Sequence, residues 1–317
     1  MKKDFIRYIG KVLLFIGAVV MLDVLSGIVL RKLHRASFER NSQRFEVRAL
    51  YAIEKGDAEI AIIGASDASH SYISREIEDS LGLTTFNYGK DGCFFIYQNC
   101  LINLMLERYA PKVIVWEIGK ACLSVDQNGD DRQWQSISDF YPYYDQNKYC
   151  YDVINKKGIY QHLFMYSSLY RFNSKLLSIL EPFISSEEVP ATKGYLPLPN
   201  TGYIYPEYHV SKTSNSIDPW KVELLKGTLD LLRDKSVKVV FCFSPGYGEN
   251  GSERTSQFNK LKEMVKLYDV SMIDYQDSPV FMSDSTLFKD ARHLNDKGAK
   301  LYMEYFIPEL KTVLEKQ

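Results

Sequence analysis

A serine follows a short apolar run near the start of the polar part of the chain. Residues 60–72 read IAIIGASDASHSY, and the apolar side chains stop at Gly64 and Ala65, directly before Ser66. Small residues at this point allow a sharp turn from a strand into a helix, which would expose the Ser66 hydroxyl close to amide groups that can bind developing negative charge. The pattern is compatible with a nucleophile, with a phosphate-binding turn, or with a turn that has no chemical role.

A carboxylate and an imidazole stand close together near the other end of the chain. Residues 288–300 read FKDARHLNDKGAK, in which Asp290 precedes His293 by three positions. In a helical turn this spacing puts both side chains on one face, where the carboxylate can orient the ring and stabilise its protonated form. A surface ion pair at the start of the last helix is the alternative. Together with Ser66, the pair predicts a Ser-His-Asp triad.

Five short apolar runs, several rich in β-branched residues, predict buried parallel strands. Longer mixed segments between them are expected to form helices. Strands alternating with helices indicate an α/β fold, a three-layer doubly wound parallel sheet with helices on both faces. The expected strands are residues 58–64, 84–89, 112–119, 237–244 and 270–275, and the expected helices are residues 74–80, 94–109, 219–234, 256–267 and 296–315.

This fold would position the two chemical segments. Reactive groups in such sheets gather beyond the carboxyl ends of the strands, so Ser66 and the pair Asp290 and His293 are expected at one edge. Residues 120–236 are far longer than a crossover needs and are predicted to be an insertion in a domain of residues 45–317. Twelve of the 23 tyrosines lie between positions 141 and 208. These rings could form a lid or a wall that binds sugars, or could fill the interface between insertion and sheet.

The first 44 residues predict a membrane anchor with a basic flank. Residues 12–30 are nineteen residues with one charge, Asp23, and as a helix they would span about 28 Å, close to the hydrocarbon thickness of a bilayer. Four Lys or Arg residues precede this stretch and five follow it, so charge alone does not set the orientation. Asp23 would face another membrane protein or be a tolerated carboxyl group.

Composition excludes several classes of protein. The 39 basic and 40 acidic residues give a net charge of −1, and no basic block is present, so nucleic acid is not expected as a partner. The five cysteines, at positions 93, 100, 122, 150 and 242, form no CxxC pair and no cluster with histidine at metal-ligand spacing. We expect neither a metal nor a cofactor.

Three segments together resemble the SGNH/GDSL hydrolase superfamily. GAS at residues 64–66 is similar to the nucleophile block, FNYGKDG at residues 86–92 to the second block, and DARH at residues 290–293 to the Asp-x-x-His block. The resemblance implies a flavodoxin-like SGNH fold.

The resemblance also implies roles for individual residues. Ser66 would be the nucleophile, His293 the base and Asp290 its orienting carboxylate, with the backbone amides of Ser66 and Gly92 forming the oxyanion hole. The third block of the family, Gly-x-Asn-Asp, has no counterpart, because Gly119 is followed by Lys120, Ala121 and Cys122. One oxyanion donor is therefore missing or comes from elsewhere, and the loss of such a donor commonly costs roughly 100- to 1000-fold in turnover.

These observations predict a membrane-anchored serine esterase or O-acyltransferase. The resemblance is greatest to members that assist O-acylation of surface polymers, which implies an acylated extracytoplasmic glycan or another ester of a cell-envelope polymer as substrate. It also implies a single-pass protein of the cytoplasmic membrane with its catalytic domain outside, and a membrane-embedded acyltransferase as a further partner. A non-catalytic saccharide-binding or assembly protein on a hydrolase scaffold is the alternative.

Neighbouring residues have competing interpretations. His70 lies four positions after Ser66, but on a short helix it would point away from a hydroxyl at the helix start. Asp67 and Ser69 are expected to cap that helix. Glu117, the charge at the end of an apolar run, receives no role.

Overall fold

The computed structural model describes residues 2–40, 47–125, 132–184, 191–201, 216–247 and 256–316. The chain divides into two compact units. The sheet unit comprises residues 43–136 and 189–317, and the helical unit comprises residues 1–42 and 137–188. Residues 137–188, from the middle of the predicted insertion, thus group with the N-terminal segment. The domain boundaries expected from the sequence, 1–44 and 45–317, stay a prediction.

The sheet unit contains five strands in the order β2-β1-β3-β4-β5, and every adjacent pair is parallel. This confirms the predicted α/β class and all five predicted strands, each of which is shorter than predicted at one or both ends. Side chains on both faces are buried along β1 and β3, which explains the β-branched runs. The strands are β1 Ile60–Gly64, β2 Thr85–Asn87, β3 Val113–Glu117, β4 Lys238–Phe243 and β5 Ser271–Asp274.

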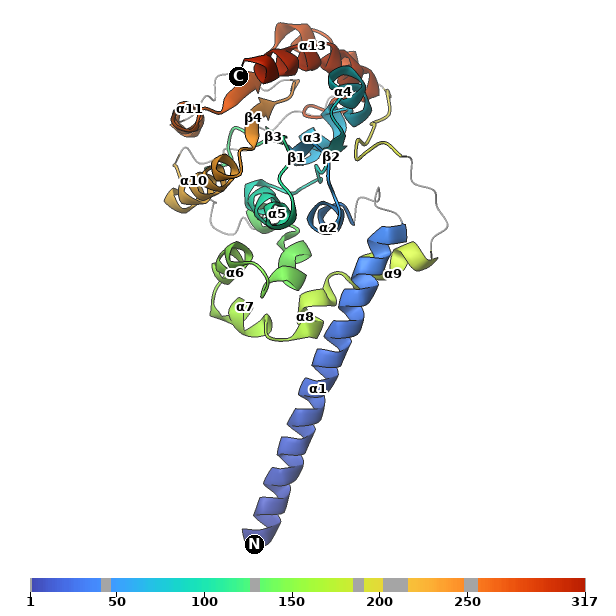
Figure 1. The fold of residues 1–317 in the computed structure, drawn as a ribbon, viewed down its shortest axis with the longest axis vertical. Coiled ribbons are helices and arrows are strands. Elements are labelled where there is room, and N and C mark those ends of the chain that lie inside the picture. The colour runs from blue at the N-terminus through green and yellow to red at the C-terminus, as the bar shows by residue number, and fades with distance from the viewer. Residues whose placement is uncertain are drawn as a thin grey trace. The chain divides into compact units, whose positions relative to one another are not determined.

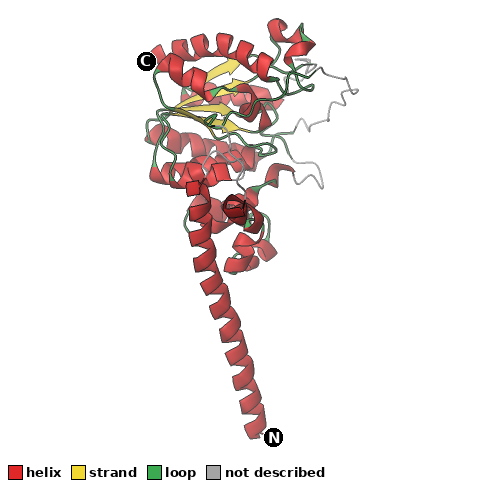
Figure 2. Ribbon diagram, turned by 90° about the vertical axis from the view of Figure 1, so that its right-hand side faces the viewer, coloured by secondary structure: helices red, strands yellow, loops and turns green. Residues whose placement is uncertain are grey.

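Helices cover both faces of the sheet. Figure 1 shows α4 and α13 on one side of the strands and α2, α5 and α10 on the other, and Figure 2 shows the strands between two layers of helices. This is the predicted three-layer arrangement. The helices of this unit are α2 Arg48–Glu54, α3 Ser66–Ser71, α4 Ser74–Leu81, α5 Phe95–Arg108, α10 Pro219–Asp234, α11 Ser256–Tyr268, α12 Pro279–Met282 and α13 Asp296–Glu315, with short 3-10 turns η2 Arg132–Trp134 and η5 Ser285–Leu287.

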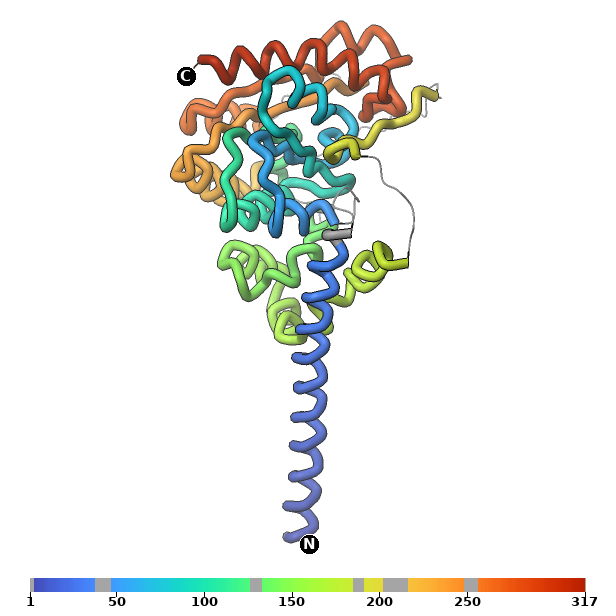
Figure 3. Tube along the Cα trace, turned by 45° about the vertical axis from the view of Figure 1, so that its right-hand side comes forward, coloured from blue at the N-terminus to red at the C-terminus, as the bar shows by residue number. Residues whose placement is uncertain are grey.

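The start of α13 is fixed by its cap. The side chain of Asn295 accepts a hydrogen bond from the backbone N–H of Gly298 at 3.0 Å and donates one to the carbonyl of Thr286 at 2.8 Å. From this point α13 runs across α4, as Figure 3 shows for the red end of the chain. The cap therefore sets the position of the loop that precedes α13, which carries Asp290 and His293.

The helical unit contains α1 and a group of short helices. In the described part of the chain, α1 is the one helix that is long and apolar enough to cross a membrane, with a mean hydropathy of 2.6 over its most apolar window. Helices α8 and α9 pack against it (Figure 1). The elements are α1 Lys2–Arg40, η3 Ile137–Tyr143, α6 Lys148–Asn155, α7 Ile159–Phe164, α8 Ser168–Asn173 and α9 Leu176–Ile184.

Aromatic rings of the insertion pack on one another inside the helical unit. Tyr141 stacks on Tyr170 with ring centroids 6.0 Å apart, and Tyr144 lies 4.9 Å from Tyr151. The tyrosines at positions 203, 205 and 208 lie outside the described residues. The predicted lid or sugar-binding wall therefore stays a prediction.

The carboxylate of Asp23 has partners within the chain. Its Oδ1 accepts hydrogen bonds from the Ser167 hydroxyl at 2.7 Å and the Leu169 N–H at 3.0 Å, and its Oδ2 accepts one from the Ser168 N–H at 2.7 Å. These donors lie at the start of α8. The two sequence hypotheses, a second membrane protein or a tolerated lone carboxyl, both missed this contact, because the donors are more than 140 positions away.

Candidate active site

The turn after β1 places Ser66 at the carboxyl edge of the sheet. Ser66 is the first residue of α3, one position beyond Ala65, which ends the turn. A Cβ atom on Gly64 would lie 2.6 Å from the Ala68 Cβ and 2.8 Å from the Glu117 Cβ. Only glycine fits at position 64, which explains the glycine two positions before Ser66.

The predicted capping of α3 by Asp67 and Ser69 is wrong. The N-cap residue of α3 is Ala65, no side chain caps the helix there, and the Ser69 hydroxyl instead donates back to the Ala65 carbonyl at 3.3 Å. The side chain of Asp67 is consequently available to another partner.

The loop before α13 brings Asp290 and His293 together, but not by a helical turn as predicted. The segment is a bend in which Asp290 Oδ1 accepts hydrogen bonds from the backbone N–H groups of Arg292 at 2.9 Å and His293 at 3.0 Å. The Lys289 N–H donates to the His293 carbonyl at 2.8 Å and closes the bend. A carboxylate that bonds its own following backbone forms this turn without helical geometry.

The structure brings the three predicted catalytic side chains into one chain of contacts. His293 Nε2 lies 2.8 Å from Ser66 Oγ, although the two residues are 227 positions apart. His293 Nδ1 lies 2.9 Å and 2.8 Å from the two carboxylate oxygens of Asp290. With the proton on Nδ1, the ring donates to Asp290 and can accept the serine proton at Nε2. This is the geometry that an activated serine nucleophile requires.

Burial and nearby charges change the pKa of the His293 ring. Burial lowers the pKa of His293, but the hydrogen bond to Asp290 and the negative charges of Asp67 and Asp290 outweigh it, so the net pKa is raised. Burial acts to raise the pKa of the Asp290 carboxyl, yet the hydrogen bond from His293 and two backbone N–H groups hold it well below its usual range. Asp290 is therefore ionised at neutral pH and stabilises the protonated ring.

Asp67 is a site residue that the sequence did not reveal. Its Oδ1 lies 3.7 Å from His293 Nε2, and its Oδ2 lies 3.8 Å from the Arg292 guanidinium. A second carboxylate on the serine side of the ring adds to the stabilisation of the imidazolium. The only sequence signal was its position directly after Ser66.

His70 does not contact the serine, in agreement with its predicted orientation. Its Nδ1 lies 2.8 Å from the Leu196 carbonyl and its Nε2 lies 3.2 Å from Asp91 Oδ2. Its ring stands edge-on to His293, with centroids 5.6 Å apart. His70 therefore forms part of the wall beside the triad, and Asp91 is its partner.

The segment of residues 86–92 is tied to the turn that carries Ser66. The side chain of Asn87 donates to the Ala68 carbonyl at 2.7 Å and accepts from the Gly89 N–H at 2.9 Å. The Lys90 N–H donates to the Gly64 carbonyl at 3.1 Å. Two residues further, Gly92 has a φ of +69°, which favours glycine. The loop is held beside Ser66, and the oxyanion role of the Ser66 and Gly92 amides stays a prediction.

A side-chain amide lies against this glycine. A Cβ atom on Gly92 would come within 2.5 Å of Gln135 Nε2. After β3, where the family carries its asparagine, Lys120 instead extends to within 3.4 Å of Asp277 and 3.8 Å of Asp274. Gln135 is the second residue that sequence reasoning missed, since its position in a long insertion carries no signal.

Glu117, which received no role from the sequence, is a buried acid behind the turn. It ends β3, is 7% exposed, and accepts hydrogen bonds from the Tyr72 hydroxyl and from the Ser244 N–H at 3.1 Å. Burial, together with the nearby charge of Asp67, raises its pKa to about 8. The carboxyl group is thus mostly neutral at pH 7.

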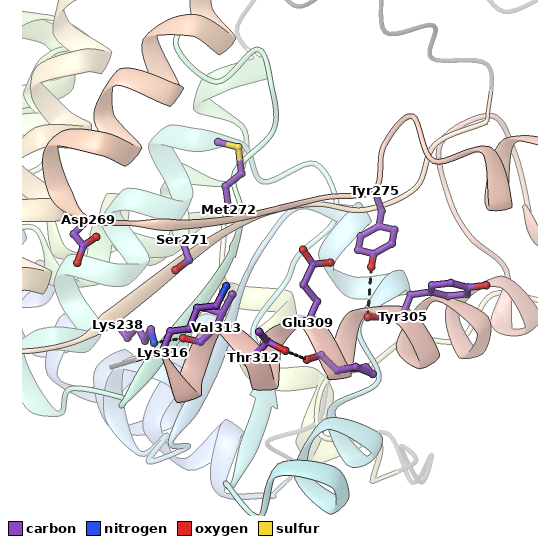
Figure 4. Close-up of a pocket in the computed structure, with 11 residues that line it drawn as sticks. Lys238, Asp269, Ser271, Met272, Tyr275, Tyr305, Glu309, Thr312, Val313 and Lys316 are labelled. Atoms are coloured by element: carbon purple, nitrogen blue, oxygen red, sulfur yellow. Dashed lines mark hydrogen bonds between the residues drawn. The ribbon is translucent and has the colours of Figure 1, made fainter.

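Other parts of the described structure do not add to this site. No group of three or more His, Cys, Asp or Glu side chains in the described residues could hold a metal ion. The hollow in Figure 4 lies along edge strand β5 and the carboxyl half of α13, between residues such as Ser271, Tyr305 and Glu309. None of Ser66, Asp290 and His293 lines it. We assign no role to this hollow.

Solved structures with a similar fold include two bacterial proteins. A protein assigned to the lipolytic G-D-S-L family, from Desulfitobacterium hafniense, is 9% identical with a TM-score of 0.41, and the match covers 78% of this chain and 97% of that one. A Bacteroides fragilis protein assigned as an acylhydrolase is 12% identical with a TM-score of 0.42, over 87% and 97% of the two chains. No family model and no curated protein matches the chain. At these identities and scores the functional conclusion depends on the site itself.

Proposed function

We propose that the sheet unit is an SGNH-type serine hydrolase that acts on acyl esters. The observation that carries the proposal is the continuous contact from Ser66 Oγ through the His293 ring to the Asp290 carboxylate, at 2.8 Å on each side of the ring. The resemblance of three sequence segments to the family blocks supports the same assignment. The raised pKa of His293 also suits a base that must hold a proton during the reaction.

The proposed reaction uses two transfers of the acyl group. Ser66 Oγ attacks the carbonyl carbon while its proton moves to His293 Nε2, and Asp290 stabilises the charged ring. The bond between the carbonyl carbon and the alcohol oxygen then breaks as His293 gives this proton to that oxygen, so the alcohol leaves and the acyl-serine remains. Water or an acceptor hydroxyl next attacks the acyl-serine and gives its proton to His293. The acyl product leaves, and Ser66 takes the proton back.

Three donors are proposed to bind the oxyanion. Two are the backbone N–H groups of Ser66 and Gly92, which lie in segments tied together by the Lys90 to Gly64 hydrogen bond. The third is the side-chain amide of Gln135, which lies against Gly92 and would replace the missing asparagine. Removing one such donor commonly costs roughly 100- to 1000-fold in turnover, so Gln135→Ala should reduce activity by this order.

The substrate is proposed to be an ester at the cell envelope, such as an acylated glycan, with the unit held at the membrane by α1. The apolar length of α1 supports this location. Transfer of the acyl group to a sugar hydroxyl, alone or with a membrane-embedded acyltransferase, is the alternative to hydrolysis. Partition of products from an aryl acetate, with and without added sugar acceptors, separates the two reactions.

A fluorophosphonate probe tests the nucleophile directly. The full chain in mild detergent should form a covalent adduct, which Ser66→Ala abolishes. Ser71→Ala is the matched control, because it removes a hydroxyl at the other end of α3 and should label like the wild type. An unreactive wild type, or a Ser66→Ala chain that labels equally, would overturn the assignment. Glycan binding by an unreactive wild type would instead favour the saccharide-binding alternative.

A further inference from the structure

A group of apolar side chains on α7, α8 and the loop between them is exposed. Tyr160 is 74% exposed, Tyr166 69% and Ile159 64%. The surfaces of soluble proteins rarely expose this many large apolar side chains within one short segment. We refer to these residues as the apolar patch: Ile159, Tyr160, Leu163, Phe164, Tyr166 and Leu169.

The segment that carries the patch has an unusual composition. Residues 159–170 contain no Asp, Glu, Lys or Arg. Two of the six patch residues are tyrosines, which combine an apolar ring with a polar tip and are enriched where membranes meet water. The segment therefore has the composition of a surface that contacts the headgroup region of a bilayer.

The patch is attached to α1 at a defined level. The carboxylate of Asp23 accepts hydrogen bonds from the backbone N–H groups of Ser168 and Leu169, so the start of α8 is held against α1. Close packing accompanies this contact, since a Cβ atom on Gly27 would lie 2.4 Å from the Ser168 Cβ. Leu169 of the patch is one of the residues that Asp23 binds, so the patch continues from the surface of α1.

The two halves of α1 differ in their surroundings. Before Asp23 its large apolar side chains are exposed, for example Leu14 at 78%. After Asp23 one face of the helix is covered, because Gly27, His34 and Ser37 are buried and α8 and α9 pack there, whereas the side chains of Leu25 and Val29 stay 50% and 55% exposed. The covered face contacts the protein's own helices and not lipid. Residues 5–22 would cross about 27 Å at 1.5 Å per residue, which matches a hydrocarbon core of about 30 Å.

We infer that the apolar patch lies in the interfacial layer of the membrane that α1 crosses, with Asp23 at its boundary rather than near its centre. The occupant of the patch is the lipid surface. Asp23 then avoids the cost of a charge in the hydrocarbon core, and its carboxylate fixes α8 at the depth where α7 and α8 enter the headgroup region. The helical unit would therefore contact the bilayer through both α1 and the patch.

Fluorescence in proteoliposomes tests this inference independently of enzyme activity. Single cysteines replace Tyr160, Leu163 or Leu169 in the full chain, and each is labelled with bimane before reconstitution. The five native cysteines are buried and should remain unlabelled in a folded protein, which also checks folding. The matched control is Lys148→Cys on α6 of the same unit, because the Lys148 side chain is 86% exposed.

Lipids with a nitroxide near the headgroup should quench the three patch positions at least about twofold more than position 148, with blue-shifted emission. Water-like emission and quenching equal to that at position 148 would overturn the inference. Blue-shifted emission without quenching would show that protein, such as a second copy of the chain, covers the patch, and would overturn it as well.

Discussion

The buried carboxyl of Glu117 should make the stability of the sheet unit fall as pH rises. Its pKa is raised to about 8 from 4.5 by burial and by Asp67, so the folded state holds the proton more tightly than the unfolded chain. The contribution is fully present below the unfolded pKa and is lost as pH rises through the folded pKa. The difference between about 8 and 4.5, at about 1.4 kcal/mol per pH unit, is on the order of 5 kcal/mol.

Glu117→Gln should remove this dependence, because the amide stays neutral and its oxygen can still accept the Ser244 N–H. Between pH 5 and 8, we expect the wild type to lose roughly 3 to 4 kcal/mol relative to the variant. Trp116 is fully buried beside Glu117, so tryptophan fluorescence during urea unfolding in mild detergent reports the transition.

Comparison of the two chains at each pH cancels the contributions of His293 and the other titrating groups. Glu304→Gln on the exposed side of α13 is the control and should leave the pH dependence of the wild type unchanged. Wild-type and Glu117→Gln curves that stay parallel from pH 5 to 8 would refute the claim that the buried carboxyl is neutral.

Three further predictions concern the triad and its turn. Because the pKa of His293 is raised, the rate of fluorophosphonate labelling should fall with decreasing pH through a midpoint above 6.5. Asp67→Asn should lower that midpoint, because it removes a charge 3.7 Å from His293 Nε2. An unchanged midpoint would exclude an effect of Asp67 on the pKa of His293. Asp290→Asn should slow labelling by on the order of 10³- to 10⁴-fold while leaving the melting temperature close to that of the wild type, and equal rates would contradict the orienting role. Gly64→Ala should cost about 1 to 3 kcal/mol of unfolding free energy, because its Cβ would lie 2.6 Å from the Ala68 Cβ; denaturant unfolding measures this, and an unchanged midpoint would show that the turn relaxes.

The sheet could be predicted because its sequence pattern is local. The apolar runs that end at Gly64 and Phe243 are buried on both faces, and burial of this kind leaves the same pattern wherever the strand lies in a parallel sheet. The ends of the strands were harder to predict. Ala58 and Glu59 were included in the first predicted strand, but β1 begins at Ile60.

The pairing of Asp290 with His293 was predicted for an incorrect local reason. A spacing of three places side chains together in a helix, but a carboxylate that accepts from the following backbone N–H groups produces the same proximity in a bend. Spacing alone does not distinguish these two conformations. The proximity was therefore more predictable than the backbone that creates it.

The contacts of Asp67, Gln135 and Asp23 could not be predicted, because each depends on a partner far away in the sequence. Asp67 was assigned to a cap on the basis of residue type, and it faces His293 only because the last loop folds over β1. The contact between Asp23 and Ser167 similarly joins two segments separated by 144 positions. Tertiary arrangement, rather than local preference, decides these contacts.

The order of the proposed catalytic residues along the chain determines when the proposed activity could arise during synthesis. The ribosome makes Ser66 early and His293 227 positions later, so a nascent chain carries its serine without a base for most of translation. Under the proposed mechanism, the Ser66 hydroxyl gains its base only after the final loop and helix leave the exit tunnel and pack beside β1. Shortened chains that end before this loop should not react with a fluorophosphonate probe.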